Sequence, residues 1–320
     1  HINMFRQVLK PVVQTARAAV VQQPSRNLSD RVLKQRMVAV GNIKKITKAM
    51  KMVASAKVRR AQDALDAARA FTQGVVDMLP EVTPESTDVS TPAAKTEGEG
   101  RTGQYLLLAV TPDRGLCGSV NGSIVRGTRA RGLHHYKVGR QISVVGLGEK
   151  TRAGLERMFA KDIKHTIGEH SKLKRRTFKQ SVILADYLLS TVPFDQGEIV
   201  YNSFKNMISF DTKVMGIQSL NLVLSEPKTF EAYDFEGDAD AVENFYSFVF
   251  ALRLHSILAE TDMVEFSQRV NSMTNSSKNA EDMLTRLRLL YNRVRQARVT
   301  TELVEIISGA TAADDAAKAQ

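Results

Sequence analysis

Residues 278–308 read KNAEDMLTRLRLLYNRVRQARVTTELVEIIS, with no Gly or Pro among them. Apolar side chains recur in this stretch at spacings of three and four, which places them along one side of an α-helix. One subset repeats every seven residues, a spacing typical of a helix that winds against another helix. Its members are Met283, Leu290, Ala297 and Val304. Gly309 is expected to end this helix, which needs a partner of similar length.

The amino-terminal part of the chain supplies such a partner. From Leu33 to Phe71 there is no Pro and one Gly, and apolar residues again recur at spacings of three and four. About forty helical residues would span roughly 60 Å, which is too long for one compact domain to bury. We therefore expect the two helices to pack antiparallel, with Ile46, Met50 and Val53 facing the contact between them.

The amino-terminal helix has a one-sided charge. Residues 31–60 contain ten Lys or Arg and no Asp or Glu, so like charges repel along the helix. The stretch is either a solvated face or a basic surface for an acidic partner. In the second case the charges would orient the two proteins and raise their rate of association more than their affinity. The net charge of +11 also favours an acidic partner, whether nucleic acid, an anionic membrane surface or a protein.

Composition narrows the class of protein. A chain of 320 residues with 43% hydrophobic residues can form one or two domains with a real core. The single cysteine, Cys117, excludes an internal disulfide and a Cys-rich metal site. No run of 18 apolar residues occurs, so no membrane-spanning helix is predicted. Residues 1–29 hold basic but no acidic residues, a composition typical of a mitochondrial transit peptide, although a retained basic arm is the alternative.

The middle of the chain predicts a small doubly wound α/β domain. Pro80 ends the first helix, and residues 80–104 are rich in Pro, Thr, Ser, Glu and Gly, which indicates a flexible surface connection. Strands and helices are then expected to alternate. The expected strands are 105–110, 142–145, 163–167, 198–204 and 220–224, and the expected helices end near 131 or cover 149–159 and 174–190.

No motif in this domain predicts chemistry. Gly146 and Gly148 match two glycines of a dinucleotide-binding turn, but the third is missing, so a tight strand–helix turn is the better interpretation. No phosphate-binding loop occurs. His134 and His135 are adjacent and diverge, which makes them poor metal ligands, and Cys117 is expected to be a packed thiol. The sequence thus predicts no catalytic, cofactor-binding or metal-ligating residue.

Three segments resemble one family. Residues 43–62, IKKITKAMKMVASAKVRRAQ, are similar to the amino-terminal helix of the gamma subunit of rotary F-type ATP synthases. Residues 113–118, DRGLCG, resemble that family's loop after the first central strand, and residues 291–310 resemble its carboxyl-terminal signature. The segments occur in the family's order. One departure is Val264 before Glu265, and the lack of a second cysteine argues against thiol regulation.

The resemblance implies a fold and a role. The fold class is a long antiparallel coiled coil of the amino- and carboxyl-terminal helices plus a small Rossmann-like α/β domain. The coiled coil would stand inside a ring of alternating alpha and beta subunits, and the domain would lie near the c-ring and the small central-stalk subunits (delta/epsilon). The chain would be a non-catalytic rotor shaft, peripheral to the mitochondrial inner membrane on its matrix side. Nucleotide and magnesium would bind the other subunits, so no cofactor is expected here.

The resemblance also implies contact residues. The expected contacts to beta-subunit loops are Lys48, Lys51, Met52, Arg295, Gln296, Thr300 and Glu302. A low-friction bearing tip is expected at Leu303, Ile306 and Ile307.

The corresponding division of the chain is expected to have six parts. They are an extension (1–29), a helix (30–79), a linker (80–104), an α/β domain (105–235), a second helix (236–310) and a tail (311–320). Two other classes of function stay open at this point. A basic helical module could bind nucleic acid or acidic protein, although no interleaved aromatics or known reader motif occurs. A nucleotide-dependent enzyme would rest on the Gly146–Gly148 turn alone.

Overall fold

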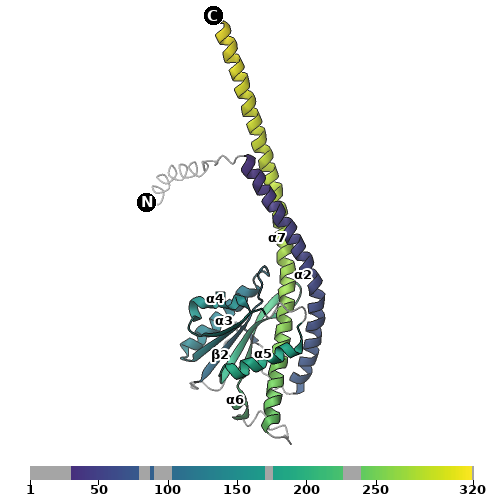
Figure 1. Ribbon diagram of the computed structural model, residues 1–320, viewed down its shortest axis with the longest axis vertical. Coiled ribbons are helices and arrows are strands. Elements are labelled where there is room, and N and C mark those ends of the chain that lie inside the picture. Colours follow the sequence, from purple (N-terminus) through teal and green to yellow (C-terminus); the bar gives the residue numbers. More distant parts are fainter. Residues whose placement is uncertain (1–29, 79–86, 90–102, 170–175, 226–238, 319–320) are drawn as a thin grey trace, which may run out of the picture. The chain divides into compact units, whose positions relative to one another are not determined.

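A computed structural model describes residues 30–78, 87–89, 103–169, 176–225 and 239–318. The expected extension at 1–29 and most of the expected linker at 80–104 lie outside these residues. The chain divides into two compact units, one formed by residues 1–46 and 276–320 and the other by residues 47–275. Two long helices, α2 (Asp30–Met78) and α7 (Ala239–Lys318), each contribute to both units (Figure 1).

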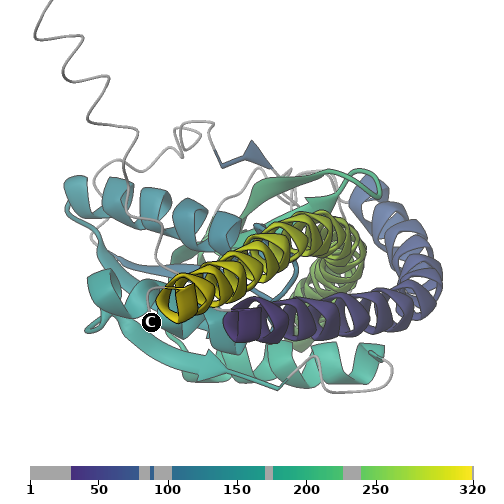
Figure 2. The ribbon, with the colours of Figure 1, turned by 90° about the horizontal axis from the view of Figure 1, so that it is seen from above.

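The long helices run antiparallel in both units, as expected. In the first unit Asp30 pairs with Arg298 at 3.5 Å and Lys44 pairs with Glu281 at 2.8 Å, so moving forward along α2 means moving back along α7. Figure 2 shows the first turns of α2, in purple, beside α7. In the second unit Leu65 of α2 is fully buried in a cluster with Met263 of α7.

The contact face of α2 differs from the expected one. Ile46 and Val53 are 58% and 61% exposed, so they do not face α7, while Met50 is half-buried. Instead, every member of two seven-residue series is buried or half-buried. The series are Leu33, Val40, Thr47, Ala54, Ala61, Ala68 and Met37, Lys44, Lys51, Val58, Leu65, Thr72. A strict seven-residue repeat keeps one seam toward the partner, and the row through Ile46 and Val53 lies one residue out of that register.

The same correction applies to α7. Met283, Leu290 and Val304 are 52%, 42% and 55% exposed, so their seven-residue repeat does not mark the contact. The less exposed positions form two neighbouring repeats. These are Met273, Ala280, Leu287, Val294 and Ser277, Leu284, Tyr291. Gly309 does not end the helix either, because α7 continues to Lys318; a helical glycine costs only about 1 kcal/mol.

The second unit contains a six-stranded mixed sheet of order β1-β6-β5-β2-β3-β4. Its strands are β1 (Thr87–Asp88), β2 (Gln104–Val110), β3 (Gln141–Leu147), β4 (Ile163–Ile167), β5 (Gln196–Phe204) and β6 (Phe210–Gln218). Strands β5, β2, β3 and β4 are parallel, whereas β6 and β1 are antiparallel to their neighbours. The sheet is therefore doubly wound in its parallel part and extended by a hairpin.

Helices cover both faces of the sheet, which explains the uninterrupted apolar sequence of β2. Leu106, Leu108 and Val110 pack in a core with α5 (Phe178–Thr191) and α7. Tyr105, Leu107 and Ala109, the alternate residues, pack in a second core with α3 (Val120–Lys137) and α4 (Glu149–Phe159). Period-two alternation along β2 thus divides its side chains between two cores. The helices that complete these cores lie on the two sides of the sheet (Figure 1).

The observed elements differ from the expected ones in three further places. Residues 220–224 were expected to form a strand, but they lie in the short helix α6 (Leu220–Ser225), because a short apolar run fits either element. Strand β6 was not expected, since its first half mixes Phe210 with Asp211, Thr212 and Lys213. The expected linker also contributes β1, which pairs with β6 through Thr87 and Asp88.

Candidate partner-contact surfaces

The ten Lys and Arg of residues 31–60, which we call the basic collar, are mostly exposed. Two have neighbours on α7: Lys44 pairs with Glu281 at 2.8 Å, and the Lys57 ammonium lies 5.3 Å from the centre of the Phe266 ring. The partner helix therefore neutralises part of the collar, which the sequence of α2 alone did not indicate. The remaining exposed cations form a basic surface.

The expected contact residues on α2 differ in their environments. Lys48 is exposed, and Met52 is 69% exposed. Lys51 is half-buried and belongs to the seam series described above. Lys48 and Met52 are thus free to reach a partner protein, whereas Lys51 extends from the edge of the seam.

On α7, the expected contact residues are all exposed. Arg295 and Gln296 lie on the helix surface. The Thr300 hydroxyl donates to the Gln296 carbonyl at 2.9 Å, and Glu302 accepts from Arg298 Nε at 2.7 Å. Glu302 therefore has a partner within its own helix, so contact with another protein would compete with this exposed pair, worth about 0–1 kcal/mol.

The expected bearing tip is exposed to a degree that is unusual for aliphatic side chains. Leu303, Ile306 and Ile307 are 54%, 67% and 63% exposed, and every described side chain from 295 to 313 is exposed. The end of α7 therefore presents an apolar surface suited to a surrounding partner.

A loop after β2 joins the sheet to α7. Asp113 Oδ1 accepts the backbone N–H groups of Glu149 at 3.3 Å and Glu169 at 3.2 Å. Arg269 of α7 donates to the Gly115 carbonyl at 3.1 Å and to Glu265 at 2.6 Å. The DRGLCG segment is therefore a structural joint, a role that its sequence alone did not indicate.

Cys117 belongs to the same joint. It is 1% exposed and packs with Val120 and with Val264 of α7. Burial raises the pKa of its thiol, although the charge of Arg269 acts in the opposite direction. A buried thiol with a raised pKa is inert toward oxidation and metal binding, which supports the interpretation of Cys117 as a packing residue.

A buried ionic cluster lies between α3 and β5 and was not expected from the sequence. Arg131 Nε donates to Glu198 Oε2 at 2.8 Å, and His135 Nε2 lies 3.6 Å from the same oxygen. Burial would raise the pKa of Glu198, but the hydrogen bond and charge of Arg131, together with the nearby His135, lower it to about 2. Tyr105 stacks on His135 with ring centres 3.8 Å apart. The adjacent His134 is exposed, but its ring lies edge to face with that of His135, with centres 5.5 Å apart, so the two side chains do not diverge as expected.

The turn at Gly146 and Gly148 has the geometry of a tight strand–helix connection. Gly148 has φ +104°, and a Cβ there would lie 2.1 Å from the Thr111 carbonyl oxygen. A Cβ on Gly146 would lie 2.8 Å from Thr151 Cγ2. Both glycines are thus explained by close packing, without any need for a bound nucleotide.

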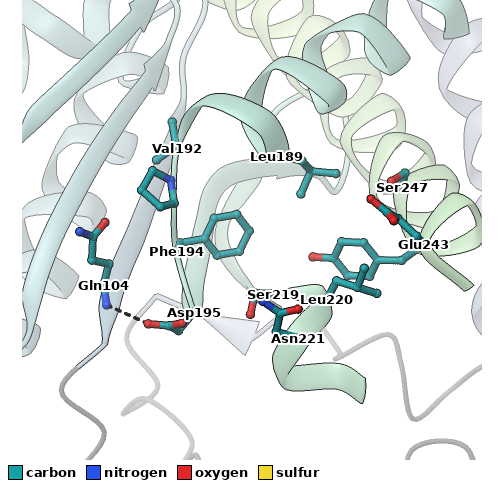
Figure 3. A pocket seen from close by; sticks show the side chains of 12 residues that line it. Gln104, Leu189, Val192, Phe194, Asp195, Ser219, Leu220, Asn221, Glu243 and Ser247 are labelled. Atoms are coloured by element: carbon teal, nitrogen blue, oxygen red, sulfur yellow. Dashed lines mark hydrogen bonds between the residues drawn. The ribbon is translucent and has the colours of Figure 1, made fainter. Parts of the chain in front are cut away.

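One pocket, with a volume of about 400 Å³, lies beside the amino-terminal ends of β2 and β5 (Figure 3). Its lining includes the carboxylates of Asp195 and Glu243, and Asp195 accepts the backbone N–H of Gln104 at 3.1 Å. Among its lining residues there is no His, Cys, Lys or Arg. The pocket therefore offers no cation to bind a phosphate.

The described residues also bear on metal sites and membrane spans. No group of three or more His, Cys, Asp or Glu side chains is placed to hold a metal ion among the residues that the structure describes. Within the same residues, no helix is both long enough and apolar enough to cross a membrane.

Comparison with known proteins places these surfaces in context. A family model described as ATP synthase matches residues 29–313. The mitochondrial ATP synthase F(1) complex subunit gamma of Rattus norvegicus is 34% identical over 280 residues, covering 88% of this chain and 97% of that protein. The mitochondrial ATP synthase subunit gamma of Ipomoea batatas is 36% identical over 298 residues, covering 90% and 86%. A chain from the central stalk and c-ring of the Tetrahymena thermophila mitochondrial ATP synthase has a TM-score of 0.57 and 28% identity, covering 72% of this chain and 99% of that chain.

Proposed function

Because the chain belongs to the gamma-subunit family of mitochondrial ATP synthases, as a non-catalytic component of the central-stalk rotor, we propose how it works. It couples rotation of the membrane c-ring to ATP synthesis and hydrolysis in the ring of alpha and beta subunits. It is peripheral to the mitochondrial inner membrane, on the matrix side. Its other partners are the small central-stalk subunits, delta and epsilon.

The observation that supports this proposal best is the exposed end of α7. Ile306 and Ile307 are 67% and 63% exposed on a helix that has no described neighbour beyond Arg298. Enclosing such side chains in a socket gains about 1–2 kcal/mol each, because full burial of an aliphatic side chain gains about 1.5–3 kcal/mol. Apolar contact is also non-directional, so a helix held in this way can turn without breaking oriented bonds.

The basic collar supplies the second contact. Lys45 and Lys48 are both exposed, and they are available to acidic loops of the beta subunits. We propose that Met52, Arg295, Gln296, Thr300 and Glu302 add contacts to loops of the same subunits. Lys51 contributes less than Lys48, because it is half-buried in the seam. Exposed ion pairs are weak, so the collar guides the rotor's orientation more than it holds the complex together.

The experiment is charge reversal of the collar in the assembled, membrane-bound synthase. Lys45→Glu with Lys48→Glu is expected to leave assembly and ATP hydrolysis close to wild type while lowering the number of protons pumped per ATP. Lys137→Glu with Lys161→Glu, an equal charge change at exposed sites of the α/β domain, serves as the control. Equal pumping by the collar variant, the control variant and the wild type at low and high salt would mean that the collar is only a solvated surface.

A further inference from the structure

The carboxyl-terminal edge of β2 and β5 is the place where the winding of the sheet reverses. The chain passes from β2 through α3, β3 and α4 to β4 along one face, and then crosses the other face through α5 to β5. Open α/β sheets bind ligands at such a switch point. In this chain, side chains of the two long helices occupy this edge. Arg269 of α7 reaches the loop after β2, and three other side chains reach the turn after β5.

The turn between β5 and β6 is closed by its own residues. Asn206 Oδ1 accepts the backbone N–H of Ile208 at 2.9 Å and of Ser209 at 2.7 Å, and the Asn206 backbone N–H donates to the Ser209 carbonyl at 3.1 Å. These bonds fix the shape of the turn. The carbonyls of Met207 and Ile208 take no part in them and are available to groups outside the turn.

Amides of α7 bind those two carbonyls. Asn271 Nδ2 donates to the Met207 carbonyl at 2.6 Å, and Gln268 Nε2 donates to the Ile208 carbonyl at 2.8 Å. Gln268 and Asn271 are three residues apart, so they lie on one side of the helix. The Met207 and Ile208 side chains remain 41% and 81% exposed, whereas Phe204 and Phe210, at the two ends of the turn, pack against apolar residues that include Met263 and Val264 of α7. The two amides therefore add directional bonds to an apolar contact.

Helix α2 adds a third contact to the same segment. Arg69 Nη2 donates to the Phe204 carbonyl at 3.0 Å, and Arg69 Nε and Nη2 donate to Glu260 of α7 at 3.0 and 2.8 Å. Both long helices therefore hold backbone carbonyls of one rigid hairpin. Hydrogen bonds weaken steeply when their angle changes, whereas apolar contacts tolerate sliding, so these contacts resist twisting of the hairpin against the helices.

We propose that Arg69, Gln268 and Asn271 form a torque key between the α/β domain and the long helices. They are positioning residues: they touch no nucleotide and make the sheet and the helices turn as one body. The inference rests on the proposed role of the chain as a rotor. Without the key, the apolar core between the sheet and α7 remains, but the domain twists further against the helices before the torque reaches the catalytic ring.

The test is single-molecule rotation of the assembled complex. The ring of alpha and beta subunits is immobilised, and a probe is attached to the α/β domain through Lys137→Cys. The key variant is Gln268→Glu with Asn271→Asp, which keeps side-chain size but removes the donors. The control is Asn275→Asp with Asn279→Asp, the same charge change at exposed positions of α7. The measured quantity is the angular variance of the probe during pauses.

We expect the key variant to raise this variance roughly twofold, because two of the three residues of the key lose their donor groups, while assembly yield and maximal ATP hydrolysis match the control. Equal variance in the key variant and the control overturns the proposal. If the wild type hydrolyses ATP without rotating, the proposed function itself fails, which is a distinct result. If the double variant does not assemble, Asn271→Ala is measured in the same way, and a variance equal to wild type again overturns the key.

Discussion

Neighbouring residues of α2 give a direct test of the seam. Ala54 is 2% exposed and Val53 is 61% exposed, so the same substitution should lower the stability much more at Ala54 than at Val53. Ala54→Asp places a carboxyl group where a charge has almost no access to water. Keeping it protonated at pH 7 costs about 4 kcal/mol, since an ordinary Asp pKa is about 3.9 and each unit is worth about 1.36 kcal/mol. Pairing with the nearby Lys51 offsets about 1 kcal/mol at most, which leaves about 3 kcal/mol.

Val53→Asp should change the stability by less than about 1 kcal/mol. Most of the Val53 side chain already contacts water, Asp and Val have similar helix propensities, and a negative charge is favourable beside the basic collar. The assay is equilibrium urea denaturation of the full chain, followed by far-ultraviolet circular dichroism. Equal losses of stability in the two variants, or a larger loss for Val53→Asp, would refute the seam.

The pH dependence of the Ala54→Asp penalty has a definite sign. Burial raises the pKa of the new carboxyl group in the folded state above its unfolded value of about 3.9. Below a pH of about 4 the carboxyl group is uncharged, so the variant loses no stability through burial of a charge. Its stability falls as the pH rises through the raised pKa. A penalty that is independent of pH between about 4 and 7 would indicate a steric cause and no burial of charge.

Three other perturbations test the remaining parts of the structure. Glu198→Gln should cost about 3–5 kcal/mol in a denaturation assay, since it leaves Arg131 buried without its counter-charge, and a variant as stable as the wild type would contradict this. In the wild type, the stability that Glu198 contributes is present above its ordinary pKa and is lost as the pH falls toward its folded pKa of about 2; acid titration of the Gln variant should lack this component. Gly148→Ala should lower the yield of folded chain, because a Cβ there lies 2.1 Å from the Thr111 carbonyl oxygen, and normal yield and melting temperature would argue against that crowding. Ile306→Asp with Ile307→Asp should leave the melting temperature of the isolated chain unchanged but reduce its co-elution with alpha and beta subunits in gel filtration. Unchanged co-elution would contradict the proposal that these side chains are enclosed in a socket.

The sequence predicted correctly those elements whose pattern of apolar residues fits only one kind of secondary structure. The apolar run at 105–110 became β2 because both faces of the sheet are covered, and the Pro- and Gly-poor stretches became α2 and α7. The predicted contact face of α2 was wrong because α2 has apolar residues on more than one side. Only the partner helix decides which side is buried, and it selects a continuous repeat that includes Lys44, Thr47 and Lys51.

The contacts between sheet and helices could not be predicted from local patterns. Arg269 is distant in sequence from Asp113 and Gly115, and nothing in the sequence indicates that the Gly115 carbonyl accepts a hydrogen bond from a guanidinium of α7. The Arg131–Glu198 pair likewise depends on α3 lying over β5. In contrast, the exposed apolar residues at 303, 306 and 307 were identified through family resemblance, and their exposure in the structure fits a surface that awaits a partner.

The most direct measurement of the central claim is rotation of this chain inside the complex. Lys137→Cys is exposed, whereas the native Cys117 is 1% exposed, so a probe can be attached selectively to the α/β domain. With the ring of alpha and beta subunits immobilised and ATP supplied, the account predicts continuous rotation of the probe in one direction. Sustained ATP hydrolysis by the same complexes with a stationary probe would contradict it.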